Sequence, residues 1–388
     1  MHPRHRLDLR SRDVVRGLAA VVVARRRGCA ERMLLREVGA SDDVLATLSV
    51  RAAWDLLLTA SDWPEGAEVV VSAITHPAMA ALVSEAGFVP VPVDLDLASL
   101  LPTPAALEDA ITPRTRAVLV AQLFGGRSDL GQIAATCRAH GLLLVEDAAQ
   151  AWTGPETLRS AADVTLVSFG LIKTATAVGG ALVRVSDPEL LARLRRLHPT
   201  WPVQPRRAYA RRLVRAQVLL VISRPRVHGL LLGACRLGGV DPERLLGRLT
   251  RGSSAGDSLQ RRRRPSAALL ATLTWRLRPA DPSAARTRAR TASGEALRAG
   301  LPAQVPQPGE RAVRTHWLFP VRADDPAALV ARLRRAGVDA SAGTSNLVAL
   351  TTDGPAADLM RHVVYVPAYP ELPEEWRQAV RRVLSQDA

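Results

Sequence analysis

Apolar residues in the first half of the chain form short runs separated by turn-forming residues. Three runs, at 142–145, 164–167 and 181–185, have the length and the β-branched content of buried strands. Longer stretches of helical periodicity flank them. This pattern predicts an α/β fold in which a mostly parallel central sheet is covered by helices.

Changes in composition divide the chain into five segments. We expect a helical arm over 1–40, a large domain with the central sheet over 41–187, and a basic and apolar helical insertion over 188–260. Connecting helices over 261–300 and a smaller C-terminal α/β domain over 301–388 complete the chain. In the small domain we expect strands at 315–321 and 363–366, and helices at 326–336 and 373–385. A chain of 388 residues is long enough for two domains that each have a core.

Lys173 is the single lysine among 52 lysine and arginine residues. A guanidinium stays protonated in proteins, whereas an amine can lose its proton and attack a carbonyl group. A chain that uses arginine elsewhere and keeps one lysine suggests a site that needs a nucleophilic nitrogen, as a Schiff base does. The alternative is that a GC-rich genome removed lysine and left this one by accident. Composition alone weighs the two interpretations evenly.

Three polar residues stand where the predicted strands end. Asp147 follows the first run, Ser168 ends the second, and Lys173 comes five positions later. Open α/β sheets bind ligands at the carboxyl ends of their strands. A pyridoxal phosphate enzyme needs a carboxylate at the pyridine nitrogen, a hydroxyl near the phosphate and a lysine for the Schiff base. Alone, the aspartate would be a helix cap and the serine a turn residue, but together the three favour this cofactor.

Further motifs along the chain resemble the DegT-type aminotransferases of nucleotide-linked keto-sugars, which are fold-type I pyridoxal phosphate enzymes. The similar segments are 66–76, 86–96, 107–118, 121–150 and 365–373, and they occur in the family's order. The segment around Asp147 is the most similar. The chain is identified as a divergent member of this family. The resemblance implies a fold-type I transferase with a large cofactor-binding domain, and a homodimer.

The resemblance assigns roles to single residues. It makes Lys173 the Schiff-base and proton-transfer residue, and it places Asp147 at the pyridine nitrogen and Gln150 at the ring hydroxyl. His76 would stack on the cofactor ring, and Ser168 would bind the phosphate. Without the resemblance, His76 would more simply be a surface or core histidine.

The chain departs from the family pattern near the phosphate. At the position of residues 49–53 the family has a Ser/Thr-rich turn whose backbone amides cradle the phosphate. By this resemblance, the amide of Ala52 would be one of them. Arg51 stands where threonine is common, and it either pairs with the phosphate or is a solvated arginine of the first helical turn. Arg262 replaces an asparagine that contacts the partner's phosphate. A cross-subunit phosphate ligand is therefore expected at Arg262.

The loops around Lys173 depart from the family pattern as well. The loop between Gln150 and Ser168 is short and lacks most of the usual glycines, and Gly179 follows Lys173 by only six positions. Thr174 stands where asparagine is common. These changes lie on the substrate side, so they affect the identity of the acceptor more than the cofactor.

The formal net charge is +15, and basic clusters flank a stretch at 199–258 that does not align with the family. Its apolar runs at 216–223 and 228–234 are too short to span a bilayer. Basic flanks around them suit a helix pair on an anionic membrane surface or on a partner protein. The plainest alternative is an insertion whose apolar sides pack on the enzyme. Aromatic residues make up only 4% of the chain and no nucleic-acid motif occurs, so a nucleic-acid partner is disfavoured.

The three cysteines are far apart and lack the spacing of metal or redox sites. They suggest buried thiols in a reducing compartment, and no metal is expected. The start of the chain is basic and then apolar, with arginines directly after the apolar run. This pattern favours an amphipathic helix over a signal peptide. We expect a cytoplasmic enzyme, with peripheral membrane contact through 199–258 as an option.

Three function classes stand side by side. The first is an aminotransferase that moves an amino group from glutamate to a nucleotide-linked keto-sugar, in amino sugar and polysaccharide biosynthesis. The second is other pyridoxal phosphate chemistry on the same fold, such as sugar dehydration. Dehydrating relatives typically carry histidine where this chain has Lys173, which argues against it. The third is a non-catalytic protein that keeps the fold for binding or regulation.

Overall fold

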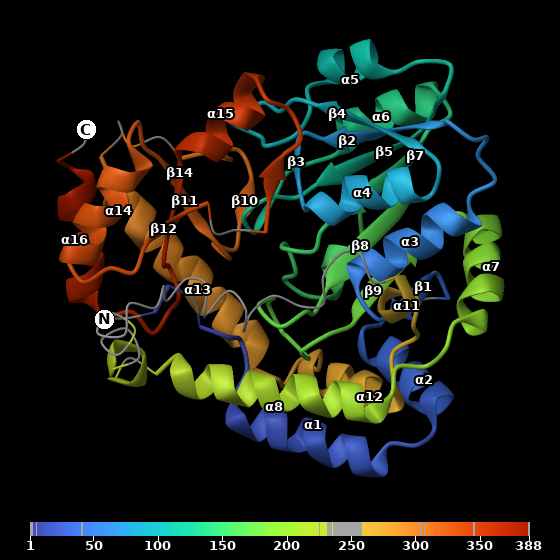
Figure 1. Cartoon of the computed structure of the whole chain (residues 1–388), viewed down its shortest axis with the longest axis horizontal. Coiled ribbons are helices and arrows are strands. Elements are labelled where there is room, and N and C mark those ends of the chain that lie inside the picture. Colours follow the sequence, from blue (N-terminus) through green and yellow to red (C-terminus); the bar gives the residue numbers. More distant parts are fainter. Residues whose placement is uncertain are drawn as a thin grey trace.

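A seven-stranded sheet forms the centre of the computed structural model, in the order β1-β9-β8-β7-β5-β2-β4 (Figure 1). The structure describes residues 3–4, 6–39, 42–224, 226–230, 235, 258–302, 305, 307–343 and 346–386. The strands of the central sheet are β1 (Val44–Thr47), β2 (Glu68–Ser72), β4 (Val89–Val93), β5 (Thr115–Ala121), β7 (Leu143–Asp147), β8 (Val164–Ser168) and β9 (Ala181–Val185). β9 runs antiparallel to both neighbours, and the remaining pairs are parallel. The predicted mostly parallel sheet is confirmed.

Side chains of the central strands alternate between two apolar cores, as the period of a strand requires. Val69 and Val71 belong to a core that also holds apolar side chains of α3 (Val50–Ala60), α4 (Pro77–Glu85) and α7 (Pro188–Leu197). Val70 points to the other face and belongs to a core with α5 (Pro104–Ala110) and α6 (Gly131–Ala139). A strand buried on both faces reads as a continuous apolar run, which is why these strands could be found in the sequence.

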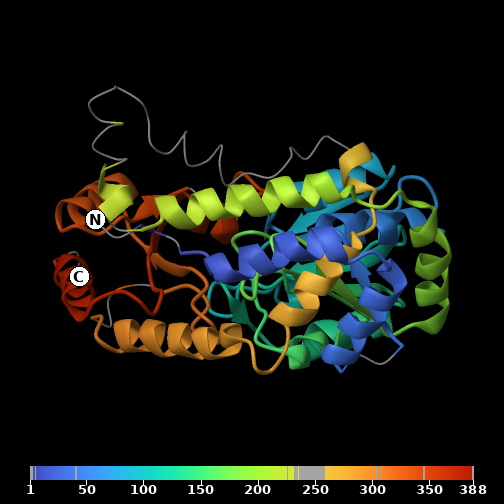
Figure 2. The same cartoon turned by 90° about the horizontal axis from the view of Figure 1, so that it is seen from below.

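Two helices from the start of the chain and two from beyond its midpoint lie side by side along one edge of the large domain (Figures 1 and 2). They are α1 (Ser11–Val23), α2 (Arg27–Glu37), α8 (Arg206–Ile222) and α12 (Ala267–Arg276). Gly17 on α1 allows the close approach of α8. A Cβ atom at Gly17 would lie 2.9 Å from Cδ2 of Leu213, whose side chain is fully buried.

The insertion expected over 188–260 begins with α7 and continues into α8. Four α8 side chains join the large apolar core, namely Tyr209, Leu213, Ala216 and Leu219. Val214, Val218 and Val221 of the same helix stay exposed. One face of α8 therefore packs on the enzyme. This agrees with the simplest interpretation of the insertion, in which its apolar sides pack on the rest of the protein. Part of the second apolar run, 231–234, lies outside the described residues. No helix in the described part of the chain has the length and apolar character needed to cross a membrane.

A smaller sheet of order β11-β14-β12 lies near the C-terminus. Its strands are β11 (Phe319–Arg322), β12 (Ser341–Ala342) and β14 (Val363–Val366), and they share a core with α14 (Pro326–Arg335) and α16 (Glu374–Leu384). The long helix α13 (Pro282–Ala299) connects the two parts, and its Leu297 is buried in the smaller core. Between the small sheet and the central one lie three short strands and one helix, β3 (Ile74–Thr75) paired with β13 (Val348–Ala349), β10 (Val313–Arg314) and α15 (Gly354–His362).

The strand predicted at 315–321 is wrong as a single element. β10 ends at Arg314 and β11 begins at Phe319. Between them His316 has a φ of 48°, in the left-handed region that a continuous strand excludes. Trp317, directly after the break, belongs to no strand and lines the cavity described below.

Two glycines within helices allow a matched test of the α1–α8 contact. A Cβ atom at Gly28 on α2 would make only an ordinary contact, 3.7 Å from Nη1 of Arg32, so Gly28→Ala should raise stability by about 0.5–1 kcal/mol through helix propensity. Gly17→Ala gains the same propensity but crowds Leu213, and it should instead lower stability by about 1–3 kcal/mol. Thermal unfolding of both variants measures the difference. Equal shifts for the two would show that the helices do not approach as closely as described.

Candidate active site

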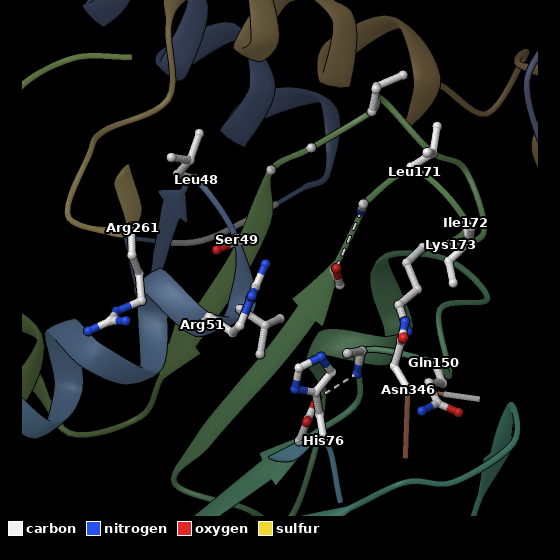
Figure 3. A pocket seen from close by; sticks show the side chains of 18 of the residues that line it. Leu48, Ser49, Arg51, His76, Gln150, Leu171, Ile172, Lys173, Arg261 and Asn346 are labelled. Atoms are coloured by element: carbon white, nitrogen blue, oxygen red, sulfur yellow. Dashed lines mark hydrogen bonds between the residues drawn. The ribbon is translucent and has the colours of Figure 1, made fainter. Parts of the chain in front are cut away.

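A cavity of about 690 Å³ opens at the carboxyl ends of β7 and β8. Its volume is typical of pockets that hold a cofactor together with a substrate. Six of the predicted site residues line it, namely Arg51, His76, Asp147, Gln150, Ser168 and Lys173. In the view of Figure 3, Lys173 and Asn346 lie on one side, Ser49 and Arg51 lie on the other, and His76 lies between them. The six predicted residues come from the start of α3, the N-cap of α4, and the ends of β7 and β8 with the loops that follow them, so only folding brings them together.

Lys173 lies in a tight turn after β8, where its amide donates to the carbonyl oxygen of Gly170 at 2.9 Å. Burial lowers the pKa of the Lys173 amine to about 8, and the negative charge of Asp147 opposes that shift. The Nζ atom lies 4.2 Å from the ring centroid of Trp317. An amine with this pKa is partly deprotonated near neutral pH and can attack a carbonyl group.

Asp147 is the last residue of β7 and is 8% exposed. Burial raises the pKa of its carboxyl group, while the Ala149 amide and the charge of Lys173 oppose that shift. The Ala149 amide donates to Oδ1 at 3.0 Å and fixes the carboxylate on the strand end. Asp147 and Lys173 are therefore close enough for each to change the other's protonation.

His76 caps the N-terminus of α4, because its Nδ1 accepts a hydrogen bond from the Ala78 amide at 3.1 Å. This bond places the ring proton on Nε2. Burial lowers the pKa of His76 to about 4, and the charges of Arg51 and Lys173 add to the effect. His76 is thus a neutral, flat ring at neutral pH, held at the cavity wall by its own helix.

Gln150 and Ser168 are both half-buried at the cavity. The side-chain oxygen of Gln150 accepts from the Phe124 amide at 2.9 Å, which leaves its amide nitrogen as the donor group. Ser168 ends β8, and its hydroxyl accepts weakly from the Gly170 amide at 3.4 Å. Both side chains are oriented by backbone groups of the strand ends.

Arg51, Ala52 and Arg262 differ in their positions. Arg51 lies in the first turn of α3 and lines the cavity. The Ala52 amide donates to the Ser49 hydroxyl at 3.1 Å, as a helix cap, so this amide is already engaged. Arg262 does not line the cavity of its own chain. Its Nη2 lies 3.0 Å from Oδ1 of Asp55, and its side chain is 48% exposed.

The loop that follows Lys173 is held by buried polar groups. Asp8 of the N-terminal arm accepts from the Ala175 amide at 2.6 Å, and Arg276 of α12 donates to the Thr176 carbonyl at 3.0 Å. The guanidinium of Arg276 lies 3.6 Å from the Asp8 carboxylate. Ala175 has a φ of 51°, a conformation that a residue with a Cβ seldom adopts. The anchors on both sides therefore hold a strained backbone in place.

Two further anchors complete this support. Arg290 of α13 donates to Oγ1 of Thr174 at 3.0 Å and to the Thr315 carbonyl at 2.9 Å. The hydroxyl of Tyr209 on α8 donates to the Ala177 carbonyl at 2.9 Å. Arg290 and Tyr209 are buried, as is Arg276. The loop thus depends on contacts with helices distant in the sequence.

Several cavity residues were missed in the sequence. Trp317 was assigned to a strand, and its Nε1 donates to the Ile172 carbonyl at 2.9 Å. Asn346 lies on a loop before β13, where the sequence contains no motif that indicates a binding site. Arg211, Arg212 and Arg215 of α8 also line the cavity. Their spacing along one helix was visible as a basic cluster, but without the fold it indicated only a charged surface.

The middle of the chain matches a known family. Residues 31–210 match the model of the DegT/DnrJ/EryC1/StrS aminotransferase family. The match bears out the resemblance that the sequence motifs indicated. It agrees with the predicted enzyme class, an aminotransferase, and with its cofactor, pyridoxal phosphate. Most residues that line the cavity fall within the matched segment, whereas Trp317 and Asn346 come from the C-terminal part of the chain.

Solved structures of similar fold cover nearly the whole chain. CalS13, a sugar aminotransferase from Micromonospora echinospora, is 22% identical and matches with a TM-score of 0.68 over 100% of each chain. The aminotransferase TlmJ from Streptoalloteichus hindustanus is 21% identical, with a TM-score of 0.68 over 95% of this chain and 96% of that one. Spr1654 from Streptococcus pneumoniae, in its PMP form, is 16% identical, with a TM-score of 0.70 over 100% of each chain. At this identity the likenesses show the fold, which confirms the predicted fold class.

The coupling of Asp147 and Lys173 can be measured directly, because the single lysine gives one signal besides that of the α-amino group, and Lys173→Arg identifies which signal is which. Reductive methylation with ¹³C-formaldehyde labels Lys173, and its NMR shift followed against pH should give a pKa near 8. Asp147→Asn removes the charge that raises this pKa, so the midpoint should move to lower pH. An unchanged midpoint in the variant would show that the carboxylate does not act on the amine.

The support of the lysine loop predicts a cost for losing Asp8. Asp8→Ala leaves the Ala175 amide without its acceptor and removes one counter-charge of Arg276, which keeps Asp281 at 2.8 Å. We expect a loss of about 2–3 kcal/mol in thermal or denaturant unfolding. Asp324→Ala, at an exposed position, serves as the control and should change stability by less than about 0.5 kcal/mol. In the Asp8 variant, Lys173 should also react faster with a water-soluble amine reagent, since its loop is less firmly held.

Proposed function

We propose that this aminotransferase takes its amino group from an amino acid, with glutamate as the donor, and gives it to a keto-sugar linked to a nucleotide. The observation that carries the proposal is the position of Lys173. The chain's single lysine lies in the cavity beside the buried carboxylate of Asp147, and burial brings its pKa to about 8. A nucleophilic amine beside a buried carboxylate is the pair that pyridoxal phosphate requires.

When bound, pyridoxal phosphate supplies an electron sink that stabilises the carbanion left when an α-proton departs. The residues of this chain would do the rest. Lys173 would attach the cofactor and then carry the proton between the donor's α-carbon and the cofactor's C4′ carbon. Asp147 would keep the pyridine nitrogen protonated, because a carboxylate at that atom stabilises the cationic form of the ring.

The remaining cavity residues would position the ring and the phosphate. A neutral His76 can stack on a cationic ring without repelling it, and its capping bond holds the imidazole plane. Gln150 would donate its amide nitrogen to the ring oxygen. Ser168 and Arg51 would bind the phosphate. For Arg51 the cavity position favours this role over that of a solvated arginine. Arg262 as a ligand for the phosphate of a second copy stays a prediction from the resemblance, as does the homodimer.

The charge of the cavity supports an anionic acceptor. Among the described residues its lining holds five basic side chains besides Arg261, those of Arg51, Lys173, Arg211, Arg212 and Arg215, and one carboxylate, of Asp147, while Arg261 is paired with Asp55 and Glu85. A nucleoside diphosphate would bring negative charge to arginines left over from the cofactor's phosphate. CalS13, of similar fold, is a sugar aminotransferase, which agrees with a sugar as acceptor. We place the reaction in amino sugar or polysaccharide biosynthesis in the cytoplasm.

Peripheral membrane contact through 199–258 remains part of the proposal. The exposed valines of α8, Val214, Val218 and Val221, face away from the core and share their helix with exposed arginines. This combination suits the surface of an anionic bilayer. It would bring the enzyme near a pathway that assembles lipid-linked glycans.

The proposal is tested by trapping the cofactor. After incubation with pyridoxal phosphate and reduction with borohydride, mass spectrometry should find the cofactor on the peptide that contains Lys173. Lys173→Arg keeps the positive charge but cannot react, so the variant should fold normally and carry no label. A wild-type protein that stays unlabelled in excess cofactor would contradict the proposal.

Two further measurements separate the alternative functions. Glutamate added to the loaded protein should release a stoichiometric amount of 2-oxoglutarate. A labelled protein that releases none would be the non-catalytic binder, and one that dehydrates a sugar instead would carry the other chemistry. A keto-sugar on a nucleoside diphosphate should then accept the amino group far faster than the same sugar without its nucleotide. Equal rates would remove the nucleotide from the proposal.

A further inference from the structure

Two arginines at the cavity, Arg51 and Arg212, have no acidic partner among the described residues. Arg261 is balanced, because its guanidinium lies 2.7 Å from Asp55 and 2.7 Å from Glu85. In the part of the chain that the structure describes, no carboxylate lies within ion-pair distance of Arg51 or Arg212. Arg51 comes from α3 and Arg212 from α8, far apart in the sequence. The fold thus brings two unbalanced cations to one cavity.

These two guanidinium groups are close enough to repel each other. Burial lowers the pKa of Arg212, and the charge of Arg51 lowers it further. Burial also lowers the pKa of Arg51, with a contribution from Arg261. Like charges in a partly desolvated site destabilise the empty protein. Such a pair is explained if an anion lies between the two groups in the working enzyme.

Backbone and hydroxyl donors surround the same place. Arg51 follows the Ser49 cap, in the first helical turn, whose amides lack acceptors within the helix. Nη1 of Arg212 lies 3.2 Å from the point where a Cβ on Gly179 would sit, so a glycine makes room for it. The Phe169 amide donates to the Gly180 carbonyl at 3.0 Å, which sets the end of β8 with Ser168 beside these glycines. Cations and neutral donors therefore converge from α3, α8 and the end of β8.

We propose that Arg51 and Arg212 together clamp the phosphate group of the cofactor, with Arg212 supplied by α8 of the same chain. The proposal rests on the proposed function for the identity of the phosphate. A phosphate dianion accepts paired hydrogen bonds from each guanidinium and neutralises both. The insertion that carries α8 is then part of the cofactor site. It supplies within one chain the kind of contact that the resemblance expected from Arg262 of a second copy.

The test compares pyridoxal phosphate with pyridoxal, which lacks the phosphate. Equilibrium binding of both to the apoprotein is measured for the wild type and for Arg212→Met. Methionine keeps the length of the stem and removes the charge. The variant should bind pyridoxal phosphate about 10- to 100-fold more weakly and bind pyridoxal as the wild type does. Arg51→Met should show the same pattern.

Two matched variants control for general effects of charge. Arg207→Met removes an exposed arginine five positions before Arg212 on α8 that does not line the cavity, and it should leave both affinities unchanged. Arg262→Met tests the expected cross-subunit ligand. If the preference for pyridoxal phosphate over pyridoxal is lost in Arg262→Met and kept in Arg212→Met, the clamp is overturned and the phosphate belongs to Arg262.

Inorganic phosphate makes the test independent of Lys173. It should raise the unfolding temperature of the wild type and of Arg207→Met, and not that of Arg212→Met. Without phosphate, Arg212→Met should unfold no earlier than the wild type, since it loses a repelled cation. If neither pyridoxal nor pyridoxal phosphate attaches to Lys173 in the wild type, the proposed function fails, and the phosphate shifts still decide the clamp. Equal phosphate shifts in all three proteins would refute it.

Discussion

Burial of one amine is the constraint on which the site depends. An ammonium group loses its hydration in the cavity, so the pKa of Lys173 falls to about 8, and the carboxylate of Asp147 limits the fall. Both groups must stay at the sheet edge for this balance to hold. Asp147 is fixed by the end of β7 and by the Ala149 amide. Lys173 has no such strand, and its position depends on the loop around it.

That loop shows how a short segment can replace a longer, glycine-rich one. Its residues include Ala175 and Val178, both with positive φ, where glycine would be less strained. Buried side chains from the N-terminal arm, α8, α12 and α13 bond to its backbone and hydroxyl groups instead. The strain is thus balanced by contacts that form only in the folded protein. The loop around Lys173 departs from the family pattern, and the buried arginines of α12 and α13 support that altered loop.

The abundance of arginine has a consequence for the electrostatics of the enzyme. Arginine keeps its charge when partly buried and forms several directed bonds, so it can hold loops and anions alike. Arg276 and Arg290 hold backbone groups, Arg261 bridges two carboxylates, and Arg51 and Arg212 face the cavity unbalanced. Arginine therefore stabilises the fold where backbone or carboxylate groups surround it. Where it faces the cavity without such partners, it is available to bind a ligand.

The sequence alone determined the elements that local patterns encode. The runs that became β7, β8 and β9 are apolar because both faces of the sheet are covered, and residues at strand ends had to meet at one edge. This placed Asp147, Ser168 and Lys173 together, and the family motifs added His76, Gln150 and Arg51. The tertiary structure decided what no local pattern holds. His316 breaks a predicted strand, which leaves Trp317 at the cavity. α8 brings Arg212 near Arg51, and Asp8 reaches the lysine loop from the N-terminal arm. Such contacts depend on how distant helices cross, and their energy appears only when those helices pack.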